Sequence, residues 1–308
     1  MQRRVQAMWI MGKFINPFTD VGFKRIFGQE FSKPLLLDFL NNLLHGERHI
    51  VGLTLKDKEQ PGHYEGDRSI IYDIKCETDT GETIIVEMQN REHPNFKERT
   101  VYYASEAIVR QGERGTDWGY DVKAVYLVAF VNFWMEGMKP VFRTDVGLAD
   151  LHCGDLFSDR LRLVYLQLPC FAKEADDCEN DFERWIYVLK NMETLNRLPW
   201  AAQNSVFQRL AEIAEVGAMT KEERTEYDGA LKRYRDTLNV MRGAEMKGRK
   251  EGHAEGRAEG RAEGRVEGRV EGERIGRLAI ARNLKAMGLS IDDIVKASGL
   301  TAADVAAL

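Results

Sequence analysis

Alternating apolar and polar positions mark two neighbouring segments of the chain as strands. Residues 69–78 and 83–89 are rich in Ile and Val and alternate with a period of two. Asp79, Thr80 and Gly81 between them supply turn chemistry. The pattern predicts a β-hairpin with a three-residue loop, in which Gly81 takes the left-handed conformation and the pairing is centred on Thr80.

The register of this hairpin decides which polar side chains become neighbours. With pairing centred on Thr80, Asp73 lies directly opposite Glu87, with Cβ atoms roughly 4.5–5.5 Å apart. Two carboxylates this close repel each other unless one is protonated or a cation lies between them. A shift of one residue would put them on opposite faces, and the hairpin would then be an exposed acidic surface without a metal.

Gln89 adds a third polar side chain to this face. It lies two residues beyond Glu87, so both side chains project from the same side of the strand. Oxygen ligands of this kind suit magnesium or manganese, which proteins hold with one or two carboxylates, water and substrate phosphate oxygens. The residues therefore predict a metal site whose natural chemistry is phosphodiester hydrolysis.

Helical and β-branched patterns predict the elements around the hairpin. Thr19 or Asp20 is a good N-cap for a first helix with apolar side chains on one side. The apolar run 121–133 has no helical caps, which is typical of a buried central strand. The other predicted elements are helices at 33–44, 97–110, 181–195, 201–216 and 221–242 and a strand at 161–168.

The chain has a different character after residue 246. From 247 to 273 it repeats every four residues as Glu-Gly-Arg-Ala or Glu-Gly-Arg-Val. On an α-helix the residues four apart are then Glu with Glu and Arg with Arg, which repel each other, and each Gly costs up to ~1 kcal/mol. On such a helix the Glu side chains form one stripe and the Arg side chains another. Copies of the helix could stabilise one another through close contacts at the glycines and through the Glu stripe of one copy facing the Arg stripe of the next. We predict a helical stalk that forms a homo-oligomer, with a charged flexible linker as the open alternative.

The last segment, 278–308, predicts three short amphipathic helices. Gly288 and Gly299 end the first two, and Ser290 and Thr301 cap the next two. This arrangement resembles a helix-turn-helix. The helix after Thr301 contains no basic or amide side chain that could read base edges, so we expect a packing or assembly module.

Composition and charge limit the class of protein. Of the 308 residues 44% are hydrophobic, enough for a core, and no apolar run approaches the roughly 20 residues of a membrane span. The four cysteines have no spacing typical of a zinc site, and we expect reduced thiols in a cytoplasmic protein. The formal net charge of −5 is unusual for a nucleic-acid binder, so any DNA contact would depend on a local basic face.

Two motifs carry a resemblance to a known family. The order Asp73, hairpin turn and Glu87-x-Gln89 resembles the PD-(D/E)XK nuclease superfamily, in the variant where Gln replaces the usual Lys. More narrowly, the sequence Thr-Asp-Val-Gly-Phe-Lys-Arg-Ile-Phe-Gly at 19–28 followed by this hairpin resembles the recombination-promoting nuclease and putative transposase family. The resemblance implies a magnesium- or manganese-dependent DNA endonuclease with a role in recombination or mobile-element movement.

The resemblance also implies roles for individual residues. Asp73 and Glu87 would be metal ligands, the backbone carbonyl of Met88 would add a third, and Gln89 would orient the attacking water or a phosphate oxygen. Because Gln89 has no positive charge, stabilisation of the transition state must depend more on the metal or on Arg99 in the following helix.

Three further residues are candidates for the site. Lys24 could contact a phosphate or simply be solvated, and Tyr103 could pack under the site. Asp20 matches a motif position, where it could hold a second metal or a water, or it could simply cap a helix. The alternative function is a catalytically inactive nuclease-fold protein that acts in DNA binding or oligomeric assembly.

The predicted fold class is α/β, with a restriction-endonuclease-like mixed sheet flanked by helices, followed by a helical subdomain and a repetitive helical tail. The predicted parts are a nuclease core at 14–170, a helical subdomain at 171–245, the four-residue repeat at 246–276 and the helix-turn-helix-like module at 277–308.

Overall fold

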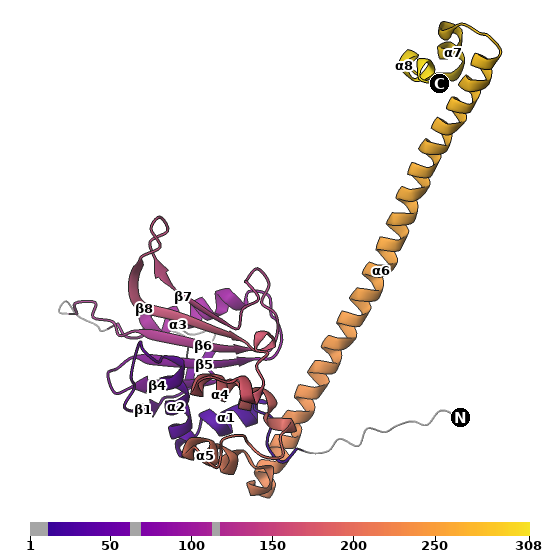
Figure 1. Cartoon of the computed structure of the whole chain (residues 1–308). Coiled ribbons are helices and arrows are strands. Elements are labelled where there is room, and N and C mark those ends of the chain that lie inside the picture. Colours follow the sequence, from indigo (N-terminus) through magenta and orange to yellow (C-terminus); the bar gives the residue numbers. More distant parts are fainter. Residues whose placement is uncertain (1–11, 62–68, 113–117) are drawn as a thin grey trace, which may run out of the picture. The chain divides into compact units, whose positions relative to one another are not determined.

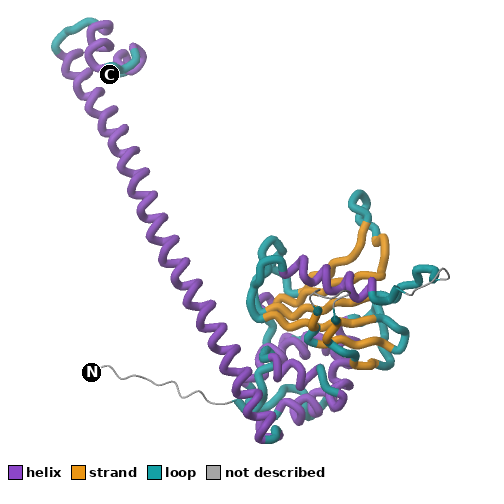
Figure 2. The backbone as a smooth tube through the Cα atoms, turned by 180° about the vertical axis from the view of Figure 1, so that it is seen from behind, coloured by secondary structure: helices purple, strands orange, loops and turns teal. Residues whose placement is uncertain are grey.

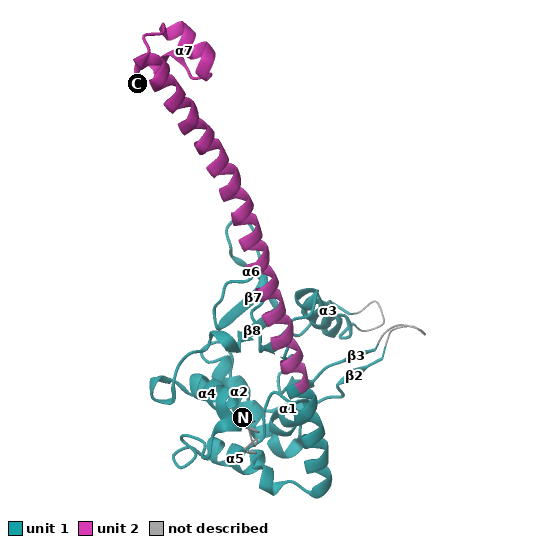
Figure 3. Ribbon diagram, turned by 90° about the vertical axis from the view of Figure 1, so that its right-hand side faces the viewer, with its two compact units in different colours: residues 1–235 teal, residues 236–308 magenta. Residues whose placement is uncertain are grey.

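The structure is a computed structural model that describes residues 12–61, 69–112 and 118–308. It divides into two compact units, residues 1–235 and residues 236–308 (Figure 3). The first unit contains a mixed six-stranded sheet of order β1-β4-β5-β6-β8-β7 and a two-stranded sheet of β2 and β3 (Figure 1). The strands are β1 (Leu53–Leu55), β2 (Glu59–Gln60), β3 (Ile70–Ile71), β4 (Ile74–Thr78), β5 (Thr83–Gln89), β6 (Val125–Val131), β7 (Arg143–Ala149) and β8 (Leu156–Gln167).

Helices cover both faces of the six-stranded sheet, as the sequence predicted. Figure 2 shows these helices in purple beside the orange strands. One face carries α1, α2, α4 and α5, and the other carries α3. The helices of this unit are α1 (Asp20–Phe27), α2 (Lys33–Leu43), α3 (Phe96–Val109), α4 (Asp181–Asn191), α5 (Ser205–Ala214) and the first turns of α6 (Lys221–Ala286).

Strand β6 separates two apolar cores. Tyr126, Val128 and Phe130 pack on the face of α1 and α2, whereas Leu127 and Ala129 pack on the face of α3. Every residue of β6 is buried, which explains why its sequence is continuously apolar instead of alternating. The predicted buried central strand is confirmed, although β6 is shorter than the apolar run.

The helices after residue 170 pack into the same core as the first two helices. Trp185 of α4 is fully buried against Phe27 of α1, Phe39 of α2 and Phe207 of α5, with ring centroids 5.8, 6.0 and 5.3 Å away. These helices therefore hold α1 and α2 on the sheet. The boundaries at 170, 245 and 276 stay a prediction.

The β4–β5 hairpin has the predicted register. Ile74 pairs with Val86, so the pairing is centred on Thr80. Gly81 has φ +90°, a conformation that other residues adopt only with strain, and its amide donates to the carbonyl of Thr78 at 3.1 Å. The local turn chemistry therefore sets the register of the two strands.

The first strand of the hairpin differs from the prediction. The sequence predicted one strand over 69–78, but the structure has β3, a bend at Asp73 and then β4. β3 pairs with β2 in the separate two-stranded sheet, and the amide of Tyr72 donates to the carbonyl of Lys58 at 2.9 Å. The partners that interrupt the strand, Lys58 and β2, come from an earlier segment of the chain, so the regular alternation of the sequence could not show them.

Strand β7 was not predicted, and β8 begins earlier than the predicted strand at 161–168. β7 pairs antiparallel with β8 at the edge of the sheet. Most of its residues are exposed on both faces. A strand without a buried face has no reason to alternate, so the sequence carried no periodic signal for it.

The second unit contains most of α6 followed by α7 (Ile291–Ser298) and α8 (Ala302–Ala306). The caps are as predicted: Gly288 and Gly299 have positive φ, and the side chains of Ser290 and Thr301 accept amide hydrogen bonds. Ala281, Ile294 and Val305 form a small core among the three helices. Among the described residues, no helix has both the length and the apolar character needed to cross a membrane.

The four-residue repeat is helical, because α6 runs through it without a break. The sequence predicted a separate helix at the start of 278–308, but that helix is the end of α6. No proline follows Pro199, so nothing stops the helix between the repeat and residue 286.

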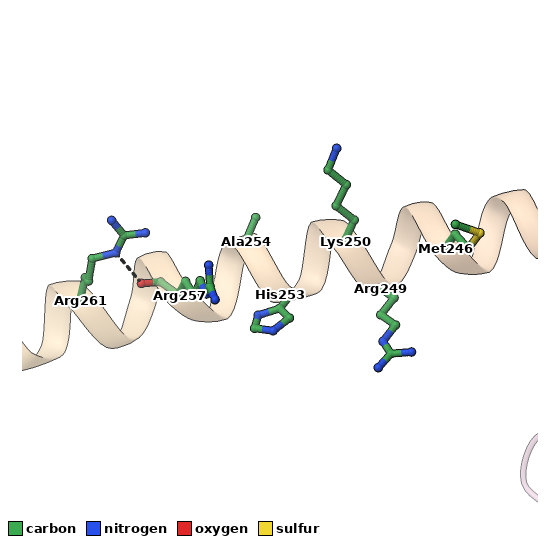
Figure 4. A pocket seen from close by; sticks show the side chains of 7 residues that line it. All are labelled: Met246, Arg249, Lys250, His253, Ala254, Arg257 and Arg261. Atoms are coloured by element: carbon green, nitrogen blue, oxygen red, sulfur yellow. Dashed lines mark hydrogen bonds between the residues drawn. The ribbon is translucent and has the colours of Figure 1, made fainter. Parts of the chain in front are cut away.

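A shallow hollow follows one side of the repeat helix. It is lined by basic side chains four residues apart, among them Arg249, His253, Arg257 and Arg261 (Figure 4). All lining residues belong to α6, so no second element closes the hollow. It is a groove between side chains of one helix and not a ligand cavity.

Candidate active site

Asp73 and Glu87 lie side by side where β4 begins. The amide of Asp73 donates to Oε1 of Glu87 at 3.3 Å, and the amide of Met88 donates to Oδ2 of Asp73 at 2.8 Å. Each carboxylate therefore bonds to the backbone of the segment that carries the other. Glu87 is only 6% exposed, so the pair lies in a largely dehydrated site.

The interruption of the strand before Asp73 alters the surroundings of Met88. In the observed register, a continued β4 would place Tyr72 opposite Met88. Instead, the Tyr72 amide donates to Lys58, and the Met88 amide takes the Asp73 carboxylate as acceptor. The Met88 carbonyl points to the same side of β5 as its amide and loses the Tyr72 amide as a donor. Strand geometry therefore directs this backbone oxygen toward the side of β5 on which Asp73 lies.

Burial raises the pKa of both carboxyl groups. The pKa of Glu87 rises from 4.5 to about 8, first because burial penalises its charged form and second because the charge of Asp73 is adjacent. Burial also raises the pKa of Asp73, although the Met88 amide and the Lys24 ammonium act in the opposite direction. A cation between the two groups would therefore stabilise their charged forms.

Helix α3 places a guanidinium next to Gln89. Arg99 donates from Nη2 to the side-chain oxygen of Gln89 at 3.0 Å, and its charge favours the ionised forms of Asp73 and Glu87. The guanidinium also lies over the ring of Tyr103, 5.7 Å from the centroid. A positive charge thus lies beside the position at which the usual lysine of the motif is missing.

Tyr103 lies against the segment that leads into Asp73. Its ring packs edge-on against Tyr72 with centroids 5.4 Å apart, and the Tyr72 hydroxyl donates to the Tyr103 carbonyl at 3.3 Å. Burial and then the charge of Glu87 raise the pKa of the Tyr103 hydroxyl. Tyr103 therefore stays protonated and contributes to the apolar floor of the site.

Helix α1 brings two charged side chains within electrostatic reach of Asp73. Thr19 is the N-cap, because its hydroxyl accepts the amide of Gly22 at 2.9 Å, and Asp20 is the first helical residue. Lys24 forms an ion pair with Asp20, four residues earlier. The charge of Lys24 lowers the pKa of Asp73 and the charge of Asp20 raises it.

One contact that positions α1 was missed in the sequence. The side-chain amide of Asn90 donates to the carbonyl of Phe18 at 2.6 Å, which ties the end of β5 to the start of α1. Asn90 directly follows Gln89, and an Asn after a strand is common in turns. Its type and position therefore gave no signal of this long-range role.

A comparison with protein families gives a match over most of the chain. The family model described as PD-(D/E)XK nuclease family transposase matches residues 17–244, which is more than half of the chain. The chain belongs to this family. The resemblance seen in the sequence and the restriction-endonuclease-like α/β fold are confirmed, and the PD-(D/E)XK membership supports a nuclease or transposase-like role. No curated protein and no solved structure matches the chain.

PD-(D/E)XK nucleases typically use divalent metals, and the donors at this site fit such an ion. The described part of the chain holds no group of three or more His, Cys, Asp or Glu side chains that could bind a metal. An ion would therefore be held by Asp73, Glu87 and the Met88 carbonyl, with water and phosphate oxygens as the remaining ligands. This set suits magnesium, which usually keeps several waters and needs only one or two carboxylates.

Proposed function

We propose that this PD-(D/E)XK protein is a divalent-metal-dependent DNA endonuclease that hydrolyses phosphodiester bonds. The observation that carries the proposal is the pairing of Asp73 with Glu87, in a site where burial disfavours two unpaired negative charges. When bound there, Mg²⁺ or Mn²⁺ would activate water and neutralise charge on the phosphate.

The side chains around this pair support distinct roles in hydrolysis. Gln89 would orient the attacking water or a phosphate oxygen through its amide group, which Arg99 holds in place. Arg99 and Lys24 would contact the phosphate, because they are the cations whose charges act on Asp73. Asp20 would hold Lys24 as its ion-pair partner, and its own charge also acts on Asp73.

Cleavage of supercoiled plasmid tests the proposal directly. The purified protein is expected to nick or linearise the plasmid with Mg²⁺ or Mn²⁺ and to leave it intact with EDTA. Asp73→Ala should abolish cleavage, whereas Glu77→Ala, a carboxylate of the same hairpin paired with Lys56, should retain it. Folded wild-type protein that cleaves with neither ion would contradict the proposal.

Replacing Arg99 tests the source of the positive charge. Arg99→Ala is expected to lower the rate of cleavage about 100-fold, because one preorganised donor to a developing charge is worth about 10²–10³ in rate. Arg99→Lys should recover part of the loss, because it restores the charge without the planar fork. Plasmid cleavage rates measure both, and Lys97→Ala is the control because Lys97 lies on the same helix and bonds the Glu136 carbonyl. Full activity of Arg99→Ala would exclude this role.

The alternative is an inactive nuclease fold that binds DNA or assembles with other copies. The observation in its favour is that Gln89 stands in place of lysine and that, among the described residues, only two carboxylates meet at the site. This alternative predicts that the protein binds DNA but does not cleave it with any metal ion. It also predicts that Asp73→Ala binds DNA as tightly as the wild type.

We further propose that copies of the chain associate through the repeat helix. Its side chains are exposed along residues 247–273, and Glu and Arg form separate stripes along the helix. Acidic stripes of one copy can face basic stripes of another, which gives each Glu a partner of opposite charge. Light scattering of the full chain at low and high salt measures its molar mass in solution and tests this proposal. Salt screens the charges of the stripes, so the chain should associate less at high salt.

A further inference from the structure

The side chain of Tyr102 is an exposed aromatic ring next to the candidate active site. It lies on α3 directly before Tyr103 and is 58% exposed. The rings of Tyr102 and Tyr103 are 6.5 Å apart at 52°. Tyr103 packs inward toward Tyr72, whereas Tyr102 presents its ring to solvent.

Arg99 and Tyr102 are neighbours on the surface of α3. They are three residues apart, which places their Cβ atoms about 5–6 Å apart on one side of the helix. Arg99 already faces the site through Gln89. A nucleotide whose phosphate meets Arg99 can therefore bring its base to Tyr102, because phosphate and base of one nucleotide span a similar distance.

The charges around Tyr102 favour a base over a phosphate as its neighbour. Glu98 lies four residues before Tyr102 and is exposed, so it would repel a phosphate at this position. The chain as a whole has 44 basic against 49 acidic residues. Without an excess of positive charge, a contact between a base and an aromatic ring would add affinity that phosphate contacts do not supply.

We propose that Tyr102 is a stacking platform for an unpaired base next to the scissile phosphate. The substrate is then single-stranded DNA, or duplex DNA with an unpaired nucleotide, since a paired base does not offer its face to an aromatic ring. This inference rests on the proposed nuclease function, for which it names the substrate class.

Binding without cleavage tests the inference. Full-length protein in EDTA is titrated against a fluorescent single-stranded oligonucleotide and against the blunt duplex of the same sequence, with anisotropy as the readout. Tyr102→Ala is expected to weaken single-strand binding about tenfold, the size of one base-stacking contact, and to leave duplex binding unchanged. Tyr102→Phe, which keeps the ring, should bind like the wild type.

Two controls separate stacking from a general effect on α3. Val101→Ala removes the neighbouring exposed apolar side chain, 46% exposed, and should not change binding. A fluorescent base analogue in the oligonucleotide should be quenched by the wild type and by Tyr102→Phe, and not by Tyr102→Ala.

The inference and the proposed function can fail separately. The inference is overturned if Tyr102→Ala binds single strands as tightly as the wild type, or if the wild type binds no single strand. It is also overturned if Tyr102→Ala loses as much affinity for the duplex, or if Val101→Ala loses as much affinity for the single strand. Failure of the wild type to cleave any DNA with Mg²⁺ or Mn²⁺ would overturn the nuclease function, whatever the binding result.

Discussion

Replacing Glu87 with Gln is expected to lower cleavage at least about 1,000-fold, because a bound divalent ion supplies several kcal/mol of charge stabilisation and each 1.36 kcal/mol is a factor of ten. The amide keeps the shape of the side chain but is a much weaker ligand than a carboxylate. It can still accept the Asp73 amide, which now donates to Glu87 at 3.3 Å. Rates of plasmid cleavage with saturating Mg²⁺ measure the effect.

The same variant is expected to be more stable than the wild type when no metal is present. The pKa of Glu87 is raised to about 8 in the folded protein from 4.5, so the folded state binds the proton more tightly than the unfolded state. The stability that the protonated group contributes is complete below pH 4.5 and is lost as the pH rises through 8. The amide introduced by Glu87→Gln does not titrate, so the variant should be more stable above pH 8, by on the order of 1–3 kcal/mol.

Thermal unfolding in EDTA at pH 5 and at pH 8.5 measures this difference. The melting temperatures of Glu87→Gln and wild type should lie close together at the lower pH and separate at the higher pH, with the variant above. Glu77→Gln is the matched control, because Glu77 lies in the same hairpin, is half-exposed and pairs with Lys56. A variant that cleaves normally, or that is less stable at pH 8.5, would contradict the role of Glu87 as a buried metal ligand.

Truncating Phe130 is expected to destabilise the fold by about 3–5 kcal/mol, the usual cost of removing a buried aromatic side chain. Phe130 is fully buried in β6. Its ring lies 5.8 Å from that of Phe23, 6.4 Å from Phe27 and 5.3 Å from Phe39. Urea denaturation of Phe130→Ala and the wild type measures the loss.

The loss of Phe130 should also reach the active site. Phe23 directly precedes Lys24 on α1, and its ring packs against Phe130. A cavity at Phe130 therefore loosens the packing of the helix that brings Lys24 toward Asp73. Phe130→Ala is therefore expected to cleave more slowly even at temperatures at which it stays folded. Phe31→Ala is the control, because Phe31 is 46% exposed and should cost little. A loss of stability below about 1 kcal/mol in Phe130→Ala would contradict this prediction. It would show that the neighbouring side chains move in and fill the space left by the Phe130 ring.

The hairpin could be predicted from the sequence because its determinants are local. The turn at Gly81 and the alternation of the two strands set the register, which runs up to the pair Ile74–Val86 and so brings the adjacent residues Asp73 and Glu87 together. Helix caps such as Thr19 and Thr301 are local in the same way, because a cap bonds within a few residues of itself.

Other parts of the structure depend on partners far away in the chain. The strand over 69–78 is interrupted because Tyr72 bonds Lys58 and β3 pairs with β2, and neither partner shows in the alternation. β7 forms because β8 offers it a free edge, although the residues of β7 have no buried face. In these cases hydrogen bonding to a distant segment overrides the local pattern.

By itself, the sequence determined the hairpin, the central strand and the pair of carboxylates, because periodicity and turn chemistry act over a few residues. The sequence named Lys24 and Arg99 as candidate cations, but only the tertiary structure placed their charges near that pair, since Lys24 arrives on α1 and Arg99 on α3, from opposite faces of the sheet. It also decided that the Met88 amide bonds the Asp73 carboxylate, because the Tyr72 segment pairs with Lys58 instead of continuing β4. The physical reason is that charge and hydrogen-bond partners act through space, whereas a sequence pattern records only neighbours along the chain.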